Sequence, residues 1–195
     1  TRSIVKGPAM DPSQARKAIS NGIEIVYDLC RNGTDIIITG EMGIGNTTTS
    51  AAIASLILGI PAEITTGRGA GLDSSGMSRK IAAIHRAIKL NKPDPTDPID
   101  VLSKLGGFDI AGMTGLFLGG AECGIPIVID GVISAVSACL AEMISPGCRD
   151  FMLPSHVSNE PSARLLLEKL GLKAPINAGF HLGEGTGGIM LLPLL

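Results

Sequence analysis

The N-terminal part of the chain alternates hydrophobic and polar positions with the period of a helix. Apolar side chains recur at spacings of three and four residues, at Ala15, Ala18, Ile19, Ile23, Val26 and Cys30. Before them, Asp11-Pro12-Ser13-Gln14 supplies a capping aspartate, a proline at the first helical position and a glutamine three residues after the cap. Gly33 is typical of a helix end. The pattern predicts a helix between Asp11 and Gly33.

Short apolar runs then alternate with longer helical patterns. The runs predict strands at Asp35–Thr39, Glu63–Thr66, Ile125–Ile129 and Asp150–Leu153. The longer patterns predict helices at Thr47–Leu58, Arg79–Leu90, Ile99–Leu105, Ile110–Gly120, Val132–Met143 and Glu160–Leu170. Strands that are apolar on both faces and separated by helices are typical of a parallel sheet. We therefore expect an α/β fold, with a doubly wound, Rossmann-like and mostly parallel sheet covered by helices on both faces.

Ligands of such sheets bind at the carboxyl ends of the strands. That rule selects four loops, which begin at Gly40, Gly67, Asp130 and Pro154. All four are rich in glycine or polar residues, and we see no internal repeat or linker that divides the chain. We expect one α/β domain over residues 1–195.

Composition and charge narrow the classes of partner. Apolar residues make up 45% of the 195 residues and charged residues 17%, which is typical of a packed domain. The net charge is −2 and no basic stripe is present, so we expect no nucleic-acid partner. The longest apolar run, Ala51 to Ile60, is too short to span a bilayer. The four cysteines have no Cys-x-x-Cys spacing, and the lack of a disulfide or signal pattern predicts a cytoplasmic protein.

The turn at residues 40–46 is the first candidate site. Its glycines let backbone N–H groups approach a ligand, and the next helix points its N-terminus at the same place, which favours an anion. Asn46 stands where a P-loop has lysine, and Thr48 stands where a dinucleotide motif has its third glycine. A single phosphate therefore fits better than a triphosphate or a dinucleotide. The alternative is a turn that only permits tight packing.

Two glutamates lie in glycine-rich surroundings. Glu41 lies inside the first turn, where a carboxylate beside an anion needs a reason, such as a bond to a second substrate. Glu184 lies in Gly183-Glu184-Gly185-Thr186-Gly187, where partial desolvation would raise its pKa and suit it to act as a general base. Helix capping is the alternative for each glutamate, and together they suggest a site with paired carboxylates.

Lys80 and Ser158 are placed where phosphate ligands often bind in α/β proteins. Lys80 opens a helix after the loop at 67–76, and Ser158 precedes the helix at 160. The alternatives are a solvated surface lysine and an N-cap serine. The three histidines have no metal spacing, and we assign none of them a role.

Six ordered segments resemble the nicotinate-nucleotide–dimethylbenzimidazole phosphoribosyltransferase family. They are Gly40–Thr48, Gly67–Asp73, Asp97–Leu102, Gly106–Met113, Val128–Gly131 and Leu182–Gly187. Family members are longer at both ends, so the resemblance implies a fragment in which a smaller helical domain is mostly absent. Residues 1–32 and 186–195 would belong to that domain.

The resemblance implies transfer of the phosphoribosyl group of nicotinate mononucleotide to 5,6-dimethylbenzimidazole, giving α-ribazole 5'-phosphate and nicotinate for cobalamin biosynthesis. It makes Glu184 the general base and lets Glu41 assist at the base site. The remaining substrate-binding positions are Met42, Gly43, Gly45, Asn46, Lys80, Ser158, Leu182, Gly183 and Gly185. It implies no metal and no cofactor, because the leaving group is already a cationic pyridinium. It also implies a homodimer.

Two other functions fit parts of the sequence. A non-catalytic nucleotide-binding α/β domain would keep the glycine turn but would not need Glu184 between glycines. A small-molecule kinase is disfavoured, because the P-loop lysine and a carboxylate pattern for Mg²⁺ are both missing.

Overall fold

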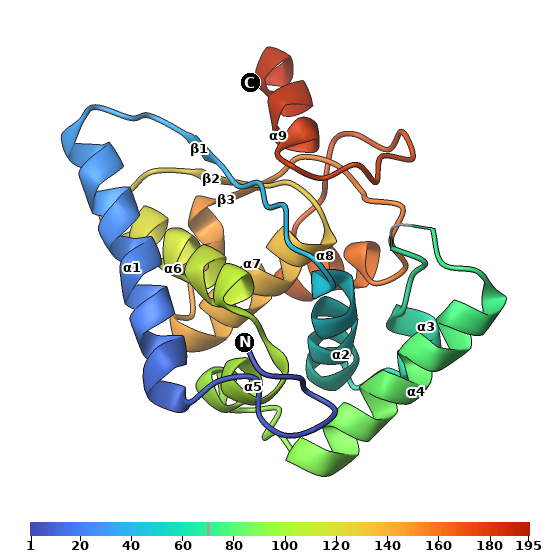
Figure 1. Ribbon diagram of the computed structural model, residues 1–195. Helices are drawn as coiled ribbons and strands as arrows, with labels where there is room; N and C mark the ends of the chain where they lie inside the picture. The colour runs from blue at the N-terminus through green and yellow to red at the C-terminus, as the bar shows by residue number, and fades with distance from the viewer. Residues whose placement is uncertain (70) are drawn as a thin grey trace.

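The structure is a computed structural model that describes residues 1–69 and 71–195. The described residues form a parallel sheet of β1 (Ile37–Ile38), β2 (Ile127–Ile129) and β3 (Met152–Pro154), in the order β1-β2-β3. Ile37 pairs with Ile127 and Val128 pairs with Leu153. The parallel α/β class expected from the sequence is confirmed, with a small sheet and many helices (Figure 1).

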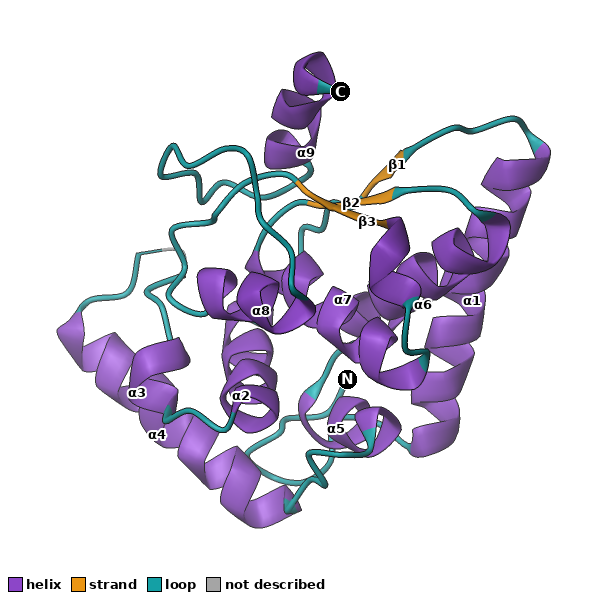
Figure 2. Cartoon of the chain, turned by 180° about the vertical axis from the view of Figure 1, so that it is seen from behind, coloured by secondary structure: helices purple, strands orange, loops and turns teal. Residues whose placement is uncertain are grey.

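Helices pack on both faces of this sheet. A Cβ added to Gly120 of α6 (Phe108–Cys123) would touch Ile127, whereas one added to Gly188 of α9 (Thr186–Leu191) would touch Ile38 and Val128. Adjacent positions of a strand point to opposite faces, so α6 and α9 lie on opposite sides. Figures 1 and 2 agree that α6 and α7 (Val132–Ile144) lie on one side, with α9 projecting from the other.

The expected N-terminal helix is present as α1 (Pro12–Arg31). The Gln14 side chain accepts a hydrogen bond from the Asp11 N–H at 2.9 Å, as the capping pattern predicts. Glycines let α1 approach α6 closely, since a Cβ on Gly115 would lie 2.0 Å from the Ile19 carbonyl oxygen. The helix therefore packs directly against the α/β core, as Figure 1 shows.

The predicted strand at Glu63–Thr66 is wrong, because this segment is the helix α3 (Ala62–Thr65). Pro61 caps it, and its carbonyl accepts the N–H of Thr65 while the Ala62 carbonyl accepts the N–H of Thr66. Four residues are too few to distinguish a helical from a strand pattern. The strand expected at Asp150–Leu153 begins later, after a 3₁₀ turn at Cys148–Phe151.

The other helices lie close to their predicted positions. They are α2 (Asn46–Leu58), α4 (Ser74–Asn91), α5 (Pro98–Leu105), α7 and α8 (Ala163–Leu170). Helix α4 begins five residues earlier than expected, because the Asp73 side chain caps it by accepting the Gly76 N–H at 2.6 Å. Among the described residues, no helix is long and apolar enough to cross a membrane.

The core lies between the sheet and the helices α2, α5, α6, α7 and α8. It is built from aliphatic side chains, with Phe117 as the largest fully buried one. Cys139 and Cys148 are buried in it, and burial raises the pKa of each thiol to about 12. Cys30 and Cys123 are half-buried and unbridged.

Candidate active site

A cavity of about 310 Å³ opens at the carboxyl ends of the three strands. Its walls are the loops after β1, β2 and β3, together with residues 181–184 and Gly69. Most of the expected site residues line it: Glu41, Met42, Gly43, Asn46, Ser158, Leu182, Gly183 and Glu184. Gly45, Lys80 and Gly185 do not, although Lys80 contacts Thr47, which does. The loop that begins at Gly67 reaches the cavity even though it follows α3 and not a strand.

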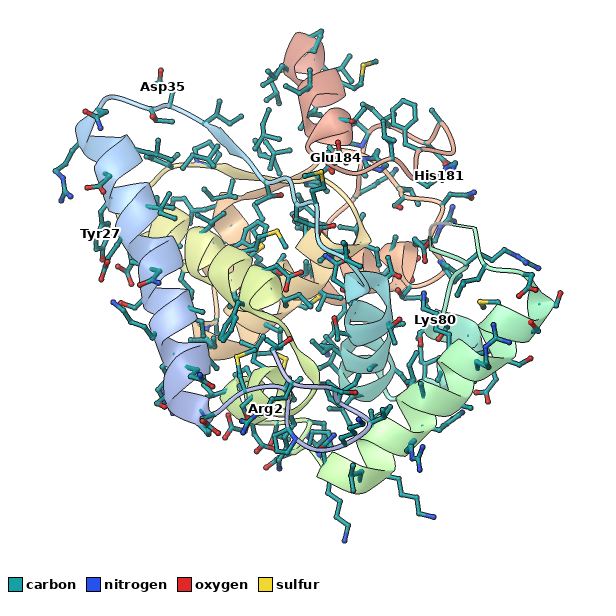
Figure 3. All side chains as sticks on the ribbon, viewed as in Figure 1. Arg2, Tyr27, Asp35, Lys80, His181 and Glu184 are labelled. Atoms are coloured by element: carbon teal, nitrogen blue, oxygen red, sulfur yellow. The ribbon has the colours of Figure 1, made fainter. Side chains whose placement is uncertain are left out.

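Main-chain pairing brings the 181–184 segment to this edge. The Val157 N–H donates to the Ile176 carbonyl at 2.9 Å, and the Asn159 N–H donates to the Phe180 carbonyl at 2.9 Å. The chain after α8 therefore runs beside the segment that follows β3. This pairing delivers Leu182 and Glu184 to the cavity from a part of the sequence that lies beyond the last strand. Figure 3 labels His181 and Glu184 on this segment.

The carboxylate of Glu41 accepts hydrogen bonds from within its own turn, residues 40–46. Glu41 Oε2 accepts the Gly43 N–H at 2.7 Å and also accepts from the Asn46 side-chain amide. Asn46 donates to Asp109 Oδ2 as well, at 2.8 Å. Glu41 thus bonds within the turn and does not cap α2, whose N-cap Gly45 precedes a helix without a side-chain cap. A phosphate could use the Gly43 N–H only after Glu41 moved.

Gly45 shapes this turn without lining the cavity. It is the exposed N-cap of α2 and has φ +80°, a conformation that strains any residue with a Cβ. Glycine is therefore favoured at position 45 because the backbone must take this conformation to enter α2.

Glu184 occupies an uncommon backbone conformation. Its φ is +57°, and only one other described non-glycine residue, the helix-capping Lys92, has a positive φ. Glu184 is exposed in this structure, so the desolvation expected from the sequence is absent. A Cβ on Gly40 would lie 2.8 Å from the Gly185 nitrogen and 2.9 Å from the Glu184 carbonyl carbon. The loops that carry the two glutamates are therefore in direct backbone contact.

Lys80 is buried and not solvated, with only 7% of its surface exposed. It points from α4 towards the loop at Gly67, where its ammonium donates to the Gly67 carbonyl at 2.9 Å and to Thr47 Oγ1 at 3.0 Å. Burial lowers the pKa of Lys80, and the nearby Glu160 carboxylate opposes that shift. The surface alternative for Lys80 is wrong, because this position of α4 faces the interior and not solvent.

Ser158 is also buried, and it does not cap α8, whose N-cap is Ser162. Its hydroxyl accepts the Glu160 N–H at 3.4 Å, and Glu160 in turn accepts the Gly69 N–H at 3.2 Å. Ser158, Glu160 and Gly69 all line the cavity. Hydrogen bonds therefore join Ser158, Glu160 and Gly69 in the cavity wall, and the Lys80 ammonium lies behind Thr47.

Two residues without a role predicted from the sequence lie in the cavity wall. Asp130 is 3% exposed and accepts the N–H groups of Gly185 and Gly188, each at 3.1 Å. His156 is 5% exposed, and burial lowers its pKa against the opposing effect of Asp130. Both follow a strand end, so the rule that selected the loops at Asp130 and Pro154 already contained the signal.

A second groove lies away from this cavity and has few polar side chains. This groove of about 440 Å³ runs between α1 and α6 and is mostly apolar, with Lys17 as its only charged lining residue among those described. Within residues 1–69 and 71–195, no group of three or more His, Cys, Asp or Glu side chains is arranged to hold a metal ion.

Comparison with known proteins gives consistent matches. A sequence model of a phosphoribosyltransferase family matches residues 1–195. The nicotinate-nucleotide–dimethylbenzimidazole phosphoribosyltransferase of Acetivibrio thermocellus is 50% identical over 190 residues, covering 97% of this chain and 54% of its own. The enzyme of the same name from Clostridium acetobutylicum is 48% identical, covering 100% of this chain and 55% of its own.

Solved structures match the fold equally well. The crystal structure of CobT from Thermus thermophilus superposes with a TM-score of 0.94 and 38% identity, covering 100% of this chain and 58% of its own. The chain thus spans little more than half the length of the relatives that it matches. With the family match over its whole length, the chain belongs to the nicotinate-nucleotide–dimethylbenzimidazole phosphoribosyltransferase family.

Proposed function

We propose that the protein containing this chain transfers the phosphoribosyl group of nicotinate mononucleotide to 5,6-dimethylbenzimidazole. The observation that carries the proposal is one shared cavity, in which Ser158 and Gly69 lie near the buried Lys80 and Glu184 lines the wall. The relatives at 44–50% identity bear the name of an enzyme with these two substrates. A benzimidazole accepts the group, and α-ribazole 5'-phosphate and nicotinate are the products.

The phosphate would bind at the end of the cavity where Ser158 and Lys80 lie. The Ser158 hydroxyl and the Gly69 N–H lie at this end, with the Lys80 ammonium next to Thr47. A buried cation that already gives up part of its hydration binds a phosphate strongly through charge-assisted hydrogen bonds. Glu160 now holds the Gly69 N–H, so phosphate binding would require this carboxylate to turn aside.

The acceptor would lie beside Met42 and Leu182, whose side chains are 82% and 74% exposed. An aromatic base placed on these two side chains would cover them and would also remove water from around Glu184. The desolvation that suits a general base would then come from the substrate.

The chemical step is a displacement with inversion. The lone pair of one benzimidazole nitrogen attacks the anomeric carbon on the face opposite nicotinate. The bond to nicotinate breaks, and its electrons neutralise the pyridinium nitrogen. The N–H proton of the now cationic benzimidazole passes to the Glu184 carboxylate. Orientation of the two substrates in one cavity supplies most of the rate enhancement, because the leaving group departs without further activation.

The test uses the full protein that contains this chain. It is mixed with nicotinate mononucleotide and dimethylbenzimidazole without added metal, and α-ribazole phosphate and nicotinate are followed by chromatography. We expect both products in equal amounts. Binding of the mononucleotide without product at any enzyme concentration would favour the alternative, a non-catalytic nucleotide-binding domain, and would refute the transferase.

Three broader properties belong to the same proposal. The four unbridged cysteines support a cytoplasmic location. The exposed apolar side chains of α9 and the 3₁₀ turn after it, Leu192–Leu194, support their burial in a smaller helical domain or in a homodimer. Residues 1–32 would join that smaller domain while still packing on α6.

A further inference from the structure

Asp130 joins the sheet to the loop that carries Glu184. The residue directly follows β2 and is 3% exposed. Oδ2 accepts the Gly185 N–H and Oδ1 accepts the Gly188 N–H, each at 3.1 Å. Both carboxylate oxygens therefore accept hydrogen bonds. Both donors, Gly185 and Gly188, lie within the four residues that follow Glu184.

The main chain of Asp130 is itself held on two sides. Its N–H donates to Ser134 Oγ at 3.3 Å, and its carbonyl accepts from Ser155 Oγ at 3.1 Å. Ser134 lies on α7 and Ser155 follows β3, and both are buried. The carboxylate thus projects from a fixed point of the sheet edge.

The loop around Glu184 needs such an anchor. Glu184 has φ +57°, and non-glycine residues hold this conformation only when their surroundings impose it. The surroundings are tight on the Asp130 side, because a Cβ on Gly187 would lie 3.0 Å from Asp130 Oδ1 and 2.0 Å from His156 Nδ1. They are tight on the other side too, where Gly40 meets the Glu184 carbonyl group.

We propose that Asp130 is a positioning residue, which fixes the backbone of the 184–188 loop so that the Glu184 carboxylate points into the substrate cavity. The inference rests on the proposed function, in which Glu184 is the general base. Asp130 acts through the Gly185 and Gly188 N–H groups and needs no contact with either substrate. Lys80 and Ser158 make no bond to Asp130, so the phosphate end of the cavity is independent of it.

The test replaces the carboxylate with an amide in the full protein. Asp130→Asn keeps the size of the side chain but has one acceptor oxygen, so one of the two buried N–H groups loses its partner. Asp35→Asn is the matched control, because Asp35 is exposed and lies just before β1. Hydrogen exchange of the peptides covering 181–191 and 74–91 is measured without substrate, alongside steady-state kinetics.

We expect exchange in 181–191 to speed up about tenfold in Asp130→Asn, with 74–91 and the Asp35→Asn control unchanged. We expect kcat to fall about tenfold or more, because the general base is no longer held in place. The KM for nicotinate mononucleotide should change less than about twofold, since the phosphate contacts are untouched. Asp130→Ala should show the same pattern more strongly.

Unchanged exchange in 181–191 would overturn the inference, whatever the kinetics show. A fall in kcat without faster exchange would mean that Asp130 acts on the substrate itself. A rise in KM without a fall in kcat would also overturn it. If the wild-type protein gave no product, the transferase would fail, and the exchange of 181–191 alone would decide whether Asp130 anchors the loop.

Discussion

The ammonium of Lys80 is buried between α4 and two loops, where it meets the Gly67 carbonyl and the Thr47 hydroxyl. The Gly67 carbonyl and the Thr47 hydroxyl are neutral, so they replace only part of the hydration that the ammonium loses on burial. Burial accordingly lowers the pKa of Lys80. An incoming phosphate would add negative charge to that of the nearby Glu160 carboxylate. This burial supports the proposal that Lys80 binds the phosphate.

Replacing Lys80 should weaken binding of nicotinate mononucleotide. We expect Lys80→Met to lose about 1.5–3 kcal/mol, or roughly 10- to 150-fold in Kd, because a charge-assisted hydrogen bond disappears. Calorimetric titration measures it, with Lys89→Met, an exposed lysine of the same helix, as the control. Equal affinities for the two variants would remove Lys80 from the phosphate site.

His156 makes the free energy of unfolding depend on pH. Burial lowers its pKa below the ordinary value of 6.5, although Asp130 opposes the shift. Below pH 6.5 the unfolded chain binds a proton that the folded chain does not, so the free energy of unfolding decreases as the pH falls through this window. Above pH 6.5 the difference disappears.

We therefore expect His156→Gln to flatten the loss of stability between pH 7 and pH 5. Chemical denaturation at a series of pH values measures the free energy of unfolding of both proteins. The wild-type curve should fall more steeply than that of the variant in this range. Parallel curves would show that His156 does not titrate differently in the folded state.

At the scale of elements, the contact between α1 and α6 depends on missing side chains. A Cβ on Gly115 would lie 2.0 Å from the Ile19 carbonyl oxygen, and one on Gly22 would lie 2.1 Å from the Gly112 carbonyl oxygen. Two helices can approach this closely only where glycine, which has no Cβ, lies at the contact. Position 112, in contrast, has open space for a Cβ.

We expect Gly115→Ala to cost about 1–3 kcal/mol of stability, because backbone atoms of α1 must shift. Gly112→Ala is the control on the same helix, and it should stabilise by about 0.5–1 kcal/mol through helix propensity. Urea denaturation of both variants measures the difference. Equal effects at the two positions would contradict the close packing of α1 on α6.

The elements show where sequence reasoning works. Periodicity and glycine turns predict the apolar runs at Ile37–Ile38 and Ile127–Ile129 and the helices after them. The segment at 62–65 does not, because Pro61 starts a one-turn helix whose Ile and Thr residues also suit a strand. Periodicity needs more than four residues to decide.

The loops that form the site were predictable from the sequence, but the contacts among them were not. The strand-end rule selected the loops of Glu41, Asp130 and Ser158, because the rule depends only on order along the chain. The contacts among these loops depend on three-dimensional distance. The bond from Glu41 to its own turn, the burial of Lys80 and the two bonds of Asp130 therefore had no signal in the spacing of residues.

At the scale of the whole molecule, the parallel sheet gathers segments from residue 40 to residue 184 around one cavity. Ser158 and Gly69 line it near the buried Lys80, Met42 and Leu182 are exposed apolar side chains in its wall, and the Glu184 loop is hydrogen-bonded to Asp130 at the sheet edge. This arrangement suits a reaction between two bound substrates. We propose that Glu184 performs the proton transfer while other residues hold the mononucleotide.

The most direct measurement compares Glu184→Gln with the wild-type full protein in turnover and in mononucleotide binding. The amide cannot accept the benzimidazole proton, so we predict that kcat falls by about 100- to 10,000-fold. The Kd for nicotinate mononucleotide should stay within about twofold, because Lys80 and Ser158 are unchanged. Turnover at the wild-type rate in Glu184→Gln would show that Glu184 is not the general base.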